Sequence, residues 1–334
     1  MQKRVLGDIL KNNAADPKLR DKAALVFQDE SLTYGQVNDR VNRLANGLLD
    51  MGVERGDRIA VLGRNSDTYV VVYFALAKVG AIMVPINFWY RDREILYTVR
   101  QSGAIGLIYD IAFAEVVAQV EREWEEMRWG LSYNGGAGGY HKDLSQVVAG
   151  RSTGEPVVEV SEDDPHIILY TSGTTGDPKG ATVSHRSHYI HGQLLADTTR
   201  GSGEDIGAVI YPLFHTGGPD CLVLPHFLRG ATLVVLDGGD PDAILGATEK
   251  HGVTNIFCVP TVWRRVLRAL DQRSYDVSSV RRCLGSSDTF PPSLLDAILE
   301  AFDAEVRTSA ARLPYGGWEC GRAWKPTLRN TRSR

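Results

Sequence analysis

The eleven residues from Tyr170 to Gly180 hold the most concentrated chemistry in the chain. They read Tyr-Thr-Ser-Gly-Thr-Thr-Gly-Asp-Pro-Lys-Gly and directly follow the apolar run 167–169. Glycines let backbone N–H groups turn toward an anion, while hydroxyls and one ammonium group supply further hydrogen-bond donors. A solvated turn has no need of this particular order. The stretch therefore predicts a loop that holds a polyphosphate at the end of a buried strand.

This loop differs from the two best-known nucleotide-binding motifs. In the pattern G-x-x-x-x-G-K-[ST] a second glycine follows five residues after the first, but Pro178 stands five residues after Gly173. Lys179 is followed by Gly180 where that pattern requires a hydroxyl residue. The spacing G-x-G-x-x-G does not occur in the chain, and the glycines within 135–139 have the wrong spacing. The loop therefore belongs to another class of phosphate-binding motif.

The stretch resembles, residue for residue, the phosphate loop of the acyl-adenylate-forming enzymes, also called the AMP-binding superfamily. Other segments resemble the same family in the same order, over about residues 30 to 305: Leu32–Val37, Lys78–Asn87, Pro212–Gly218 and Phe290–Leu295. Within the superfamily, the Phe214-His215 pair is most like the acyl-CoA synthetases, or fatty-acid–CoA ligases. A peptide-synthetase adenylation module would call for a carrier domain downstream, of which this chain shows nothing.

The resemblance implies activation of a carboxylic acid. A carboxylate oxygen attacks the α-phosphate of ATP and expels pyrophosphate, and the thiol of CoA then displaces AMP from the acyl-adenylate. Because both reactants of the first step are anions, donors that are already in position, a cation and Mg²⁺ suit the chemistry. The expected partners are ATP, CoA and a fatty or other apolar acid, and the sequence does not choose the acyl group.

The resemblance also implies roles for individual residues. Lys179, as a mobile cation, and His215, beside the α-phosphate, are expected to be catalytic. Thr171 is expected to be a Mg²⁺ ligand, since one or two protein oxygens suffice when phosphates and waters supply the rest. The residues expected to hold the nucleotide are Thr171, Ser172, Gly173, Thr174, Thr175, Gly176, Lys179, Ser286, Ser287 and Asp288.

His215 and the adenine loop each allow more than one interpretation. A lone histidine between apolar residues is more often packed in a core, and only its place in Pro212–His215 favours a role in hydrogen bonding or gating for His215. The adenine loop departs from the family, because Ser286-Ser287-Asp288 stands where many relatives have small residues such as Gly-Gly-Ala. Small serines can still present their backbone to the base, but Asp288 is unexpected.

The C-terminal segment departs further. The family continues from the strand near 304–306 into Y-G-x-[ST]-E, whose glutamate holds Mg²⁺. Here a partial echo, Tyr315–Glu319, follows several residues later with Trp318 in place of the hydroxyl residue, which weakens Glu319 as a metal ligand. The ribose-binding "TGD", the hinge and the small C-terminal domain do not follow. We therefore expect an incomplete AMP-binding N-terminal domain over residues 1–306.

Residues 307–334 form an atypical tail, interpreted as frame-shifted or disordered, without apolar periodicity. It carries Arg307, Arg312, Arg322, Arg329, Arg332 and Arg334. If neither of the other reading frames past codon 306 encodes Y-G-x-[ST]-E and "TGD", the frame-shift interpretation is wrong. The departures leave two functions open: an AMP-forming acyl-CoA synthetase, or a non-catalytic remnant that binds nucleotide or acyl ligand without turnover.

Composition indicates a soluble enzyme. A chain of 334 residues can bury a large core. Its net charge of −4 does not indicate the positively charged surface with which proteins bind nucleic acid. The N-terminus has no long apolar region, and the longest apolar stretch is interrupted by Lys78. Scattered cysteines without a C-x-x-C pair indicate reduced, mostly buried thiols in the cytoplasm: Cys221, Cys258, Cys283 and Cys320. His185, His188 and His191 are spaced to share one helix face, without indicating a metal site.

Apolar periodicity predicts alternating strands and helices along most of the chain. Helices are expected near 37–51, 67–79, 91–102, 185–197, 241–251, 260–270 and 291–302, with strands between them. Segment 129–154, rich in glycine and polar residues, is expected to be an exposed connection. Such alternation predicts an α/β fold with mostly parallel, helix-covered sheets. The resemblance implies two such sheets and, because the chain stops short, an incomplete small barrel.

Overall fold

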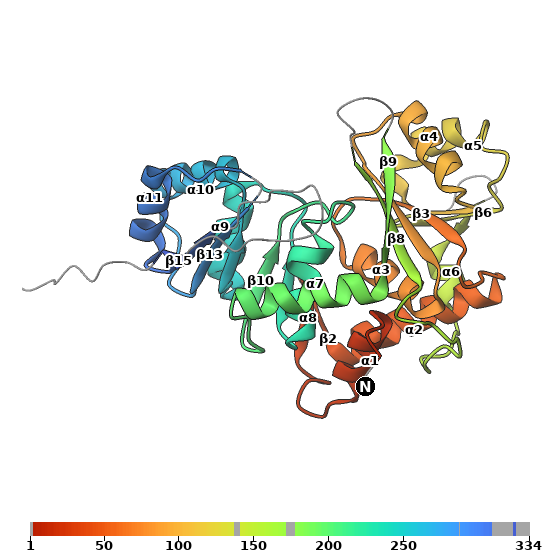
Figure 1. The fold of residues 1–334 in the computed structure, drawn as a ribbon, viewed down its shortest axis with the longest axis horizontal. Coiled ribbons are helices and arrows are strands. Elements are labelled where there is room, and N and C mark those ends of the chain that lie inside the picture. The colour runs from red at the N-terminus through yellow and green to blue at the C-terminus, as the bar shows by residue number, and fades with distance from the viewer. Residues whose placement is uncertain (1–2, 137–140, 172–177, 287, 309–322, 325–334) are drawn as a thin grey trace, which may run out of the picture.

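The computed structural model describes residues 3–136, 141–171, 178–286, 288–308 and 323–324 (Figure 1). Within these residues the strands form two open sheets, one of seven strands and one of eight. Most neighbouring strands run parallel, and helices cover the sheets. The predicted α/β class with two sheets is therefore confirmed. The barrel that was expected to be incomplete does not close within the described residues.

The seven-stranded sheet carries the two strands that flank the predicted phosphate loop. Its order is β7-β6-β5-β3-β4-β8-β9, and only the last pair, β8 with β9, is antiparallel. Its members are β3 (Arg58–Leu62), β4 (Ile82–Ile86), β5 (Gly106–Asp110), β6 (Trp129–Tyr133), β7 (Lys142–Asp143), β8 (Pro165–Thr171) and β9 (Lys179–Ser184). The central strands are buried and apolar, as expected of parallel strands covered on both faces.

The eight-stranded sheet has the order β15-β14-β13-β12-β10-β11-β1-β2. Its inner strands are parallel, while β2 and β15 close the two edges in antiparallel pairs. Its members are β1 (Ala23–Phe27), β2 (Glu30–Thr33), β10 (Ile206–Val209), β11 (Thr232–Val235), β12 (Asn255–Phe257), β13 (Arg282–Gly285), β14 (Glu305–Thr308) and β15 (Ala323–Trp324). The regular strand β14 continues two residues past the boundary expected at 306.

One layer of helices lies between the two sheets, where the largest apolar core joins them. Its members are α1 (Gly7–Ala15), α2 (Tyr34–Asp50), α3 (Asp67–Val79), α6 (Leu144–Val148), α7 (His185–Thr198) and α8 (Leu224–Leu228), with the π-helical turn η2 (Pro219–Val223) before α8. Local signals start these helices. A capping box of Thr33 and Gln36 begins α2, and the Ser66 side chain caps α3, which ends at Gly80 in the left-handed region.

The outer faces carry separate helices and separate cores. On the seven-stranded sheet these are α4 (Asp92–Ser102), the short turn η1 (Ile111–Phe113) and α5 (Ala114–Glu121). On the eight-stranded sheet they are α9 (Pro241–His251), α10 (Pro260–Gln272) and α11 (Pro292–Phe302). Figure 1 shows these two groups at opposite ends of the molecule, with α7 running across the middle. Most expected helices agree with the structure to within a few residues.

The expectation for segment 129–154 is wrong. Trp129–Tyr133 forms β6, which pairs with β5 in parallel, and Leu131 and Tyr133 enter the main core. Glycines and polar residues nearby concealed this strand in the sequence. Gly130 is required by packing, because a Cβ there would lie 2.6 Å from the His141 ring. Burial against neighbouring elements thus outweighs the local loop composition.

The lysine that interrupts the apolar stretch ends in a polar cluster inside the core. The Lys78 Nζ donates to Asn38 Oδ1 and Asn42 Oδ1, both at 2.7 Å, and pairs with Glu155 Oε2 at 2.6 Å. Burial lowers the pKa of Lys78, and the bond to Glu155 opposes this. The cluster fastens α3 and α2 to the segment that leads into β8, so the lysine has a structural role.

Three of the predicted buried thiols are confirmed. Cys221, Cys258 and Cys283 are free and buried, whereas Cys320 lies outside the described residues. Burial raises the pKa of the Cys258 thiol well above its usual range, which keeps it protonated. Within the part of the chain that the structure describes, no helix has the length and apolarity needed to cross a membrane.

Replacing Lys78 with Met tests the buried cluster. The change leaves the oxygens of Asn38, Asn42 and Glu155 without their shared donor. Because Glu155 keeps contact with water, we expect the free energy of unfolding to fall by about 1–3 kcal/mol in urea denaturation. Lys18→Met, at an exposed lysine, is the matched control with little expected change. Equal stability of the two variants would contradict a structural role for the cluster.

Candidate active site

The loops with predicted chemistry all follow carboxyl ends of parallel strands. The predicted phosphate loop follows β8, the loop with His215 (the His215 loop) follows β10, and the predicted adenine loop follows β13. Parallel strands in one sheet place such loops along the same edge, where open α/β sheets bind their ligands. The two sheets contribute different loops, so the site depends on how their edges meet.

Asn65, which sequence analysis did not single out, joins these edges. Its Nδ2 donates to the carbonyl oxygens of Tyr211 at 2.8 Å and Leu236 at 3.0 Å. Its Oδ1 accepts from the backbone N–H of Leu213 at 2.8 Å. The side chain is buried and follows β3, while its three partners follow β10 and β11. One side chain thus holds the start of the His215 loop against the other sheet, and no local signal in the sequence indicated it.

The predicted phosphate loop connects the two strands of the β8–β9 hairpin. In its register Thr171, at the end of β8, lies opposite Lys179, at the start of β9, and both are exposed. The Tyr97 hydroxyl donates to the Pro178 carbonyl oxygen at 3.0 Å and fastens the hairpin to α4. Residues 172–177, which include the predicted Ser172, Gly173, Thr174, Thr175 and Gly176, lie outside the described residues. The fold therefore places the predicted metal ligand and the predicted cation side by side.

The His215 side chain is exposed on the loop that follows β10, so it is not packed in a core. Its Nδ1 accepts from the Gly217 N–H at 3.1 Å, which is the arrangement of a neutral ring that carries its proton on Nε2. Partial burial of the ring lowers the pKa of His215, and the charge of Asp220 opposes this, although the residue as a whole stays accessible. The adjacent Phe214 packs edge-on against Phe88 and Trp89, which follow β4. A neutral, accessible imidazole suits hydrogen bonding to a ligand.

The adenine loop is only partly described. Ser286 is buried directly after β13, Ser287 lies outside the described residues, and Asp288 is exposed. An oxygen of the Asp288 carboxylate accepts from the Thr289 N–H at 2.7 Å. This contact is to its own neighbour in the loop, and nothing in the described residues explains the departure from the family pattern.

The histidines of α7 lie in a buried polar cluster beneath the His215 loop. The His166 ring lies 4.9 Å from that of His185 and 5.7 Å from that of His188, and His188 Nδ1 lies 3.4 Å from Asp220 Oδ1. Burial lowers the pKa of His185 and of His188 to about 4 and raises that of Asp220 to about 7. In the described residues, no three histidine, cysteine or acidic side chains converge on a possible metal position.

An apolar pocket opens between α7 and the eight-stranded sheet. It is lined by Leu194 and Leu195 from one face of α7 and by Phe257 and Leu284 from β12 and β13, with Arg307 at its rim. Leu194 remains half exposed, although it is large and apolar. Because Gly285 and Ser286 follow Leu284 directly, the pocket adjoins the adenine loop.

Comparison with known proteins agrees with this geometry. A sequence profile described as AMP-binding enzyme matches residues 11–309. The chain belongs to the AMP-binding enzymes. It is 34% identical over 271 residues to a feruloyl-CoA synthase of Amycolatopsis sp., a match that covers 81% of this chain and 52% of the relative.

Further members of this family extend the likeness. A medium-chain acyl-CoA ligase of Mus musculus is 29% identical over 325 residues, covering 86% of this chain and 52% of the ligase. An anthranilate CoA ligase solved in complex with anthranoyl-AMP superimposes with a TM-score of 0.87 at 25% identity, covering 93% of this AMP-binding enzyme and 60% of that chain. The chain spans about half the length of the curated relatives it matches.

Acid should destabilise this AMP-binding enzyme through the buried cluster. Unfolded histidines bind protons below their usual pKa of 6.5, but folded His185 and His188 do so only near pH 4. The unfolded state therefore binds more protons between these limits, and the free energy of unfolding falls as pH decreases through this window. Asp220 acts in the opposite sense, because its folded pKa of about 7 exceeds the ordinary 3.8.

The Asp220→Asn variant separates these contributions. It removes the opposing group, so we expect greater stability than the unchanged protein at about pH 7.5 and a steeper loss toward about pH 5. Urea denaturation at several pH values measures both. Asp271→Asn, at an exposed aspartate, is the control and should follow the unchanged protein. Parallel curves for all three proteins would contradict a buried, protonated Asp220.

Proposed function

We propose that the protein activates an apolar carboxylic acid with ATP and transfers the acyl group to CoA. The observation that carries this proposal is the β8–β9 hairpin, which sets Thr171 opposite Lys179 at the two ends of the phosphate loop. Family membership supports the acyl-adenylate chemistry. The names of relatives such as feruloyl-CoA synthase and medium-chain acyl-CoA ligase support CoA as the acceptor.

The proposed reaction has two displacement steps. A carboxylate oxygen forms a bond to the α-phosphorus, and the bond from that phosphorus to pyrophosphate breaks. The CoA sulfur then bonds to the acyl carbon, the bond to the AMP oxygen breaks, and the thiol proton passes to solvent. In this scheme Lys179 offsets the negative charge of the phosphates, and His215 donates a hydrogen bond from Nε2 beside the reacting carboxylate.

The residues present fit a magnesium ion bound mainly through phosphate. Mg²⁺ prefers oxygen ligands and keeps several waters, so the exposed Thr171 hydroxyl at the end of β8 is a suitable single protein ligand. When bound, the ion would neutralise charge on the phosphate oxygens. Lys179, directly across the hairpin, would add a second positive charge to the same phosphates.

We assign the acyl group to the apolar pocket beside α7. Leu194, Leu195, Phe257 and Leu284 offer an apolar surface that matches a hydrocarbon or aromatic group. The pocket adjoins the adenine loop, so an acid bound there would bring its carboxylate toward the nucleotide. His215 remains accessible on the neighbouring loop of the same sheet edge.

The first test is acyl-dependent pyrophosphate release from ATP by the purified chain. A panel of short, medium, long and aromatic carboxylates with Mg²⁺ should identify at least one substrate. We expect Lys179→Ala to lower the rate by about tenfold or more, since it removes a charge that stabilises the transition state. Lys18→Ala, at an exposed lysine outside the site, should keep the rate of the unchanged protein.

The same assay distinguishes the alternative. If no acid in the panel causes pyrophosphate release, but the chain still binds ATP in equilibrium dialysis, the protein binds nucleotide without turnover. Equal rates for Lys179→Ala and the unchanged protein would contradict the proposed role of the hairpin.

A further inference from the structure

The apolar pocket ends on a defined row of side chains. In the register of the sheet, Phe257 lies beside Leu284, and Leu284 beside Arg307. From α7, Leu195 closes over this row, and all four residues line the pocket. The Arg307 guanidinium is fixed by the Thr198 carbonyl oxygen at 2.7 Å, so the rim is held in place.

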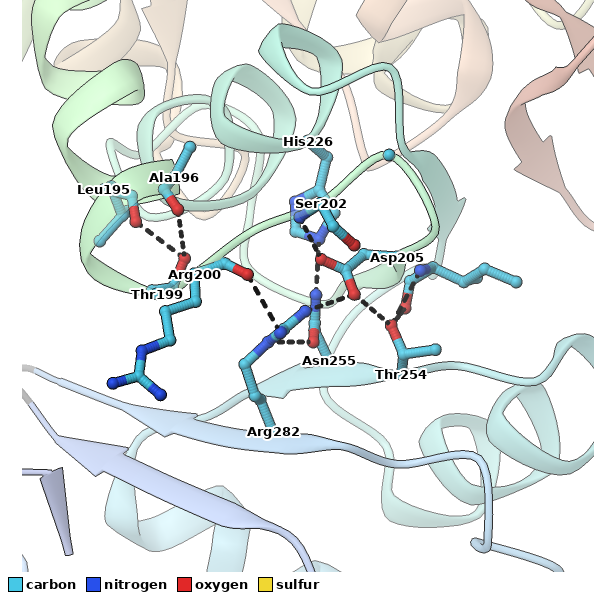
Figure 2. Close-up of polar contacts among 12 residues, drawn as sticks. Leu195, Ala196, Thr199, Arg200, Ser202, Asp205, His226, Thr254, Asn255 and Arg282 are labelled. Carbon is cyan, nitrogen blue, oxygen red and sulfur yellow. Dashed lines mark hydrogen bonds and ion pairs between the residues drawn. The ribbon is translucent and has the colours of Figure 1, made fainter.

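The next row of the same sheet face is polar. Asn255 lies beside Arg282, two residues earlier along β12 and β13, which places it about 6.6 Å further from the pocket mouth. Arg282 forms an ion pair with Asp205, and its Nε donates to Asn255 Oδ1 at 2.9 Å. Figure 2 shows this network between the end of α7 and the strands that carry Arg282 and Asn255.

The groups of the polar row bind one another. The Asn255 Nδ2 contacts His226 Nε2 at 3.4 Å, while His226 Nδ1 donates to the Leu222 carbonyl oxygen at 2.7 Å. The Asp205 carboxylate also accepts from the Ser202 N–H at 2.7 Å. Both Asp205 and Asn255 are buried. Because these partners lie within the protein, an apolar group that entered the row would break bonds without replacing them.

Little free space lies beyond the apolar row. The pocket offers about 70 Å³, and a second pocket that shares part of its lining and is also bounded by Asp205, His226 and Asn255 offers about 20 Å³. The latter is room for roughly one water. Both spaces share Leu195, Thr199, Phe257 and Leu284, so these side chains form a partition between them.

We propose that the partition of Leu195, Phe257 and Leu284, backed by the Asp205–Arg282 ion pair, restricts this enzyme to short-chain or single-ring acids. This inference rests on the proposed function. A short chain or one ring fills the apolar pocket and its mouth. A longer chain would have to displace the partition and then open a buried ion pair, which is costly because each charge would lose its partner.

Binding of stable acyl-adenylate mimics tests this without turnover. The probes are acyl-sulfamoyl adenosines with butanoyl, octanoyl, benzoyl and hexadecanoyl groups, titrated into the 334-residue chain by calorimetry. If the pocket admitted long chains, each added methylene would tighten binding about fourfold. We expect this gain to stop at or before octanoyl. The hexadecanoyl mimic should bind at least about tenfold more weakly than the octanoyl mimic.

Two partition variants locate the limit. Leu195→Ala and Phe257→Ala should each extend the gain to longer chains. Ile190→Ala, at an exposed α7 residue outside the lining, should keep the pattern of the unchanged protein. Thermal denaturation of each variant confirms folding, and Leu195→Met, which keeps the volume, should retain the limit if Leu195→Ala fails to fold.

The outcomes separate the two proposals. Affinity that rises steadily to hexadecanoyl in the unchanged protein would overturn the chain-length limit and leave the proposed function standing. A limit that stays at the same length in both partition variants would overturn the role of these residues. Failure of every mimic to bind would overturn the proposed function and, with it, this inference.

Discussion

A shared apolar layer of helices is the constraint on which the rest of the structure depends. Within the described part of the chain, each sheet buries its inner face against the same helices. Phe74 of α3 stacks on Phe227 of α8, with ring centroids 5.6 Å apart, and Tyr34 of α2 packs edge-on against Phe227. Since this core continues to Ile59 and Leu233 on opposite sheets, neither sheet can shift without disturbing it.

Because of this constraint, the candidate site is built from loops of both sheets. The phosphate loop belongs to one sheet, while the His215 loop and the adenine loop belong to the other. Asn65 is the polar counterpart of the apolar layer, because its three hydrogen bonds cross between the carboxyl ends of the sheets. Buried amides of this kind hold position by geometry, since every lost bond leaves a buried group without a partner.

Polar groups buried in the described part of the fold divide into two kinds. The Lys78 cluster and the Asp205–Arg282 network bind their own members and stabilise connections between elements. The histidine–Asp220 cluster instead carries groups whose pKa values are displaced in opposite directions by burial. The self-paired networks connect elements of the fold, and one of them borders the pocket. The histidine–Asp220 cluster makes the free energy of unfolding depend on pH.

The sequence alone determined the α/β class, the order of most elements and the family, because these depend on local periodicity and on contiguous motifs. The same contiguous motifs predicted the phosphate loop and the candidate site residues Thr171, Lys179 and His215. Only tertiary structure decided that Trp129–Tyr133 is a strand, that Asn65 joins the sheets, and that polar side chains lie next to the apolar pocket beside α7. These features depend on pairing and burial between residues far apart in the chain, and such contacts leave no local pattern to read.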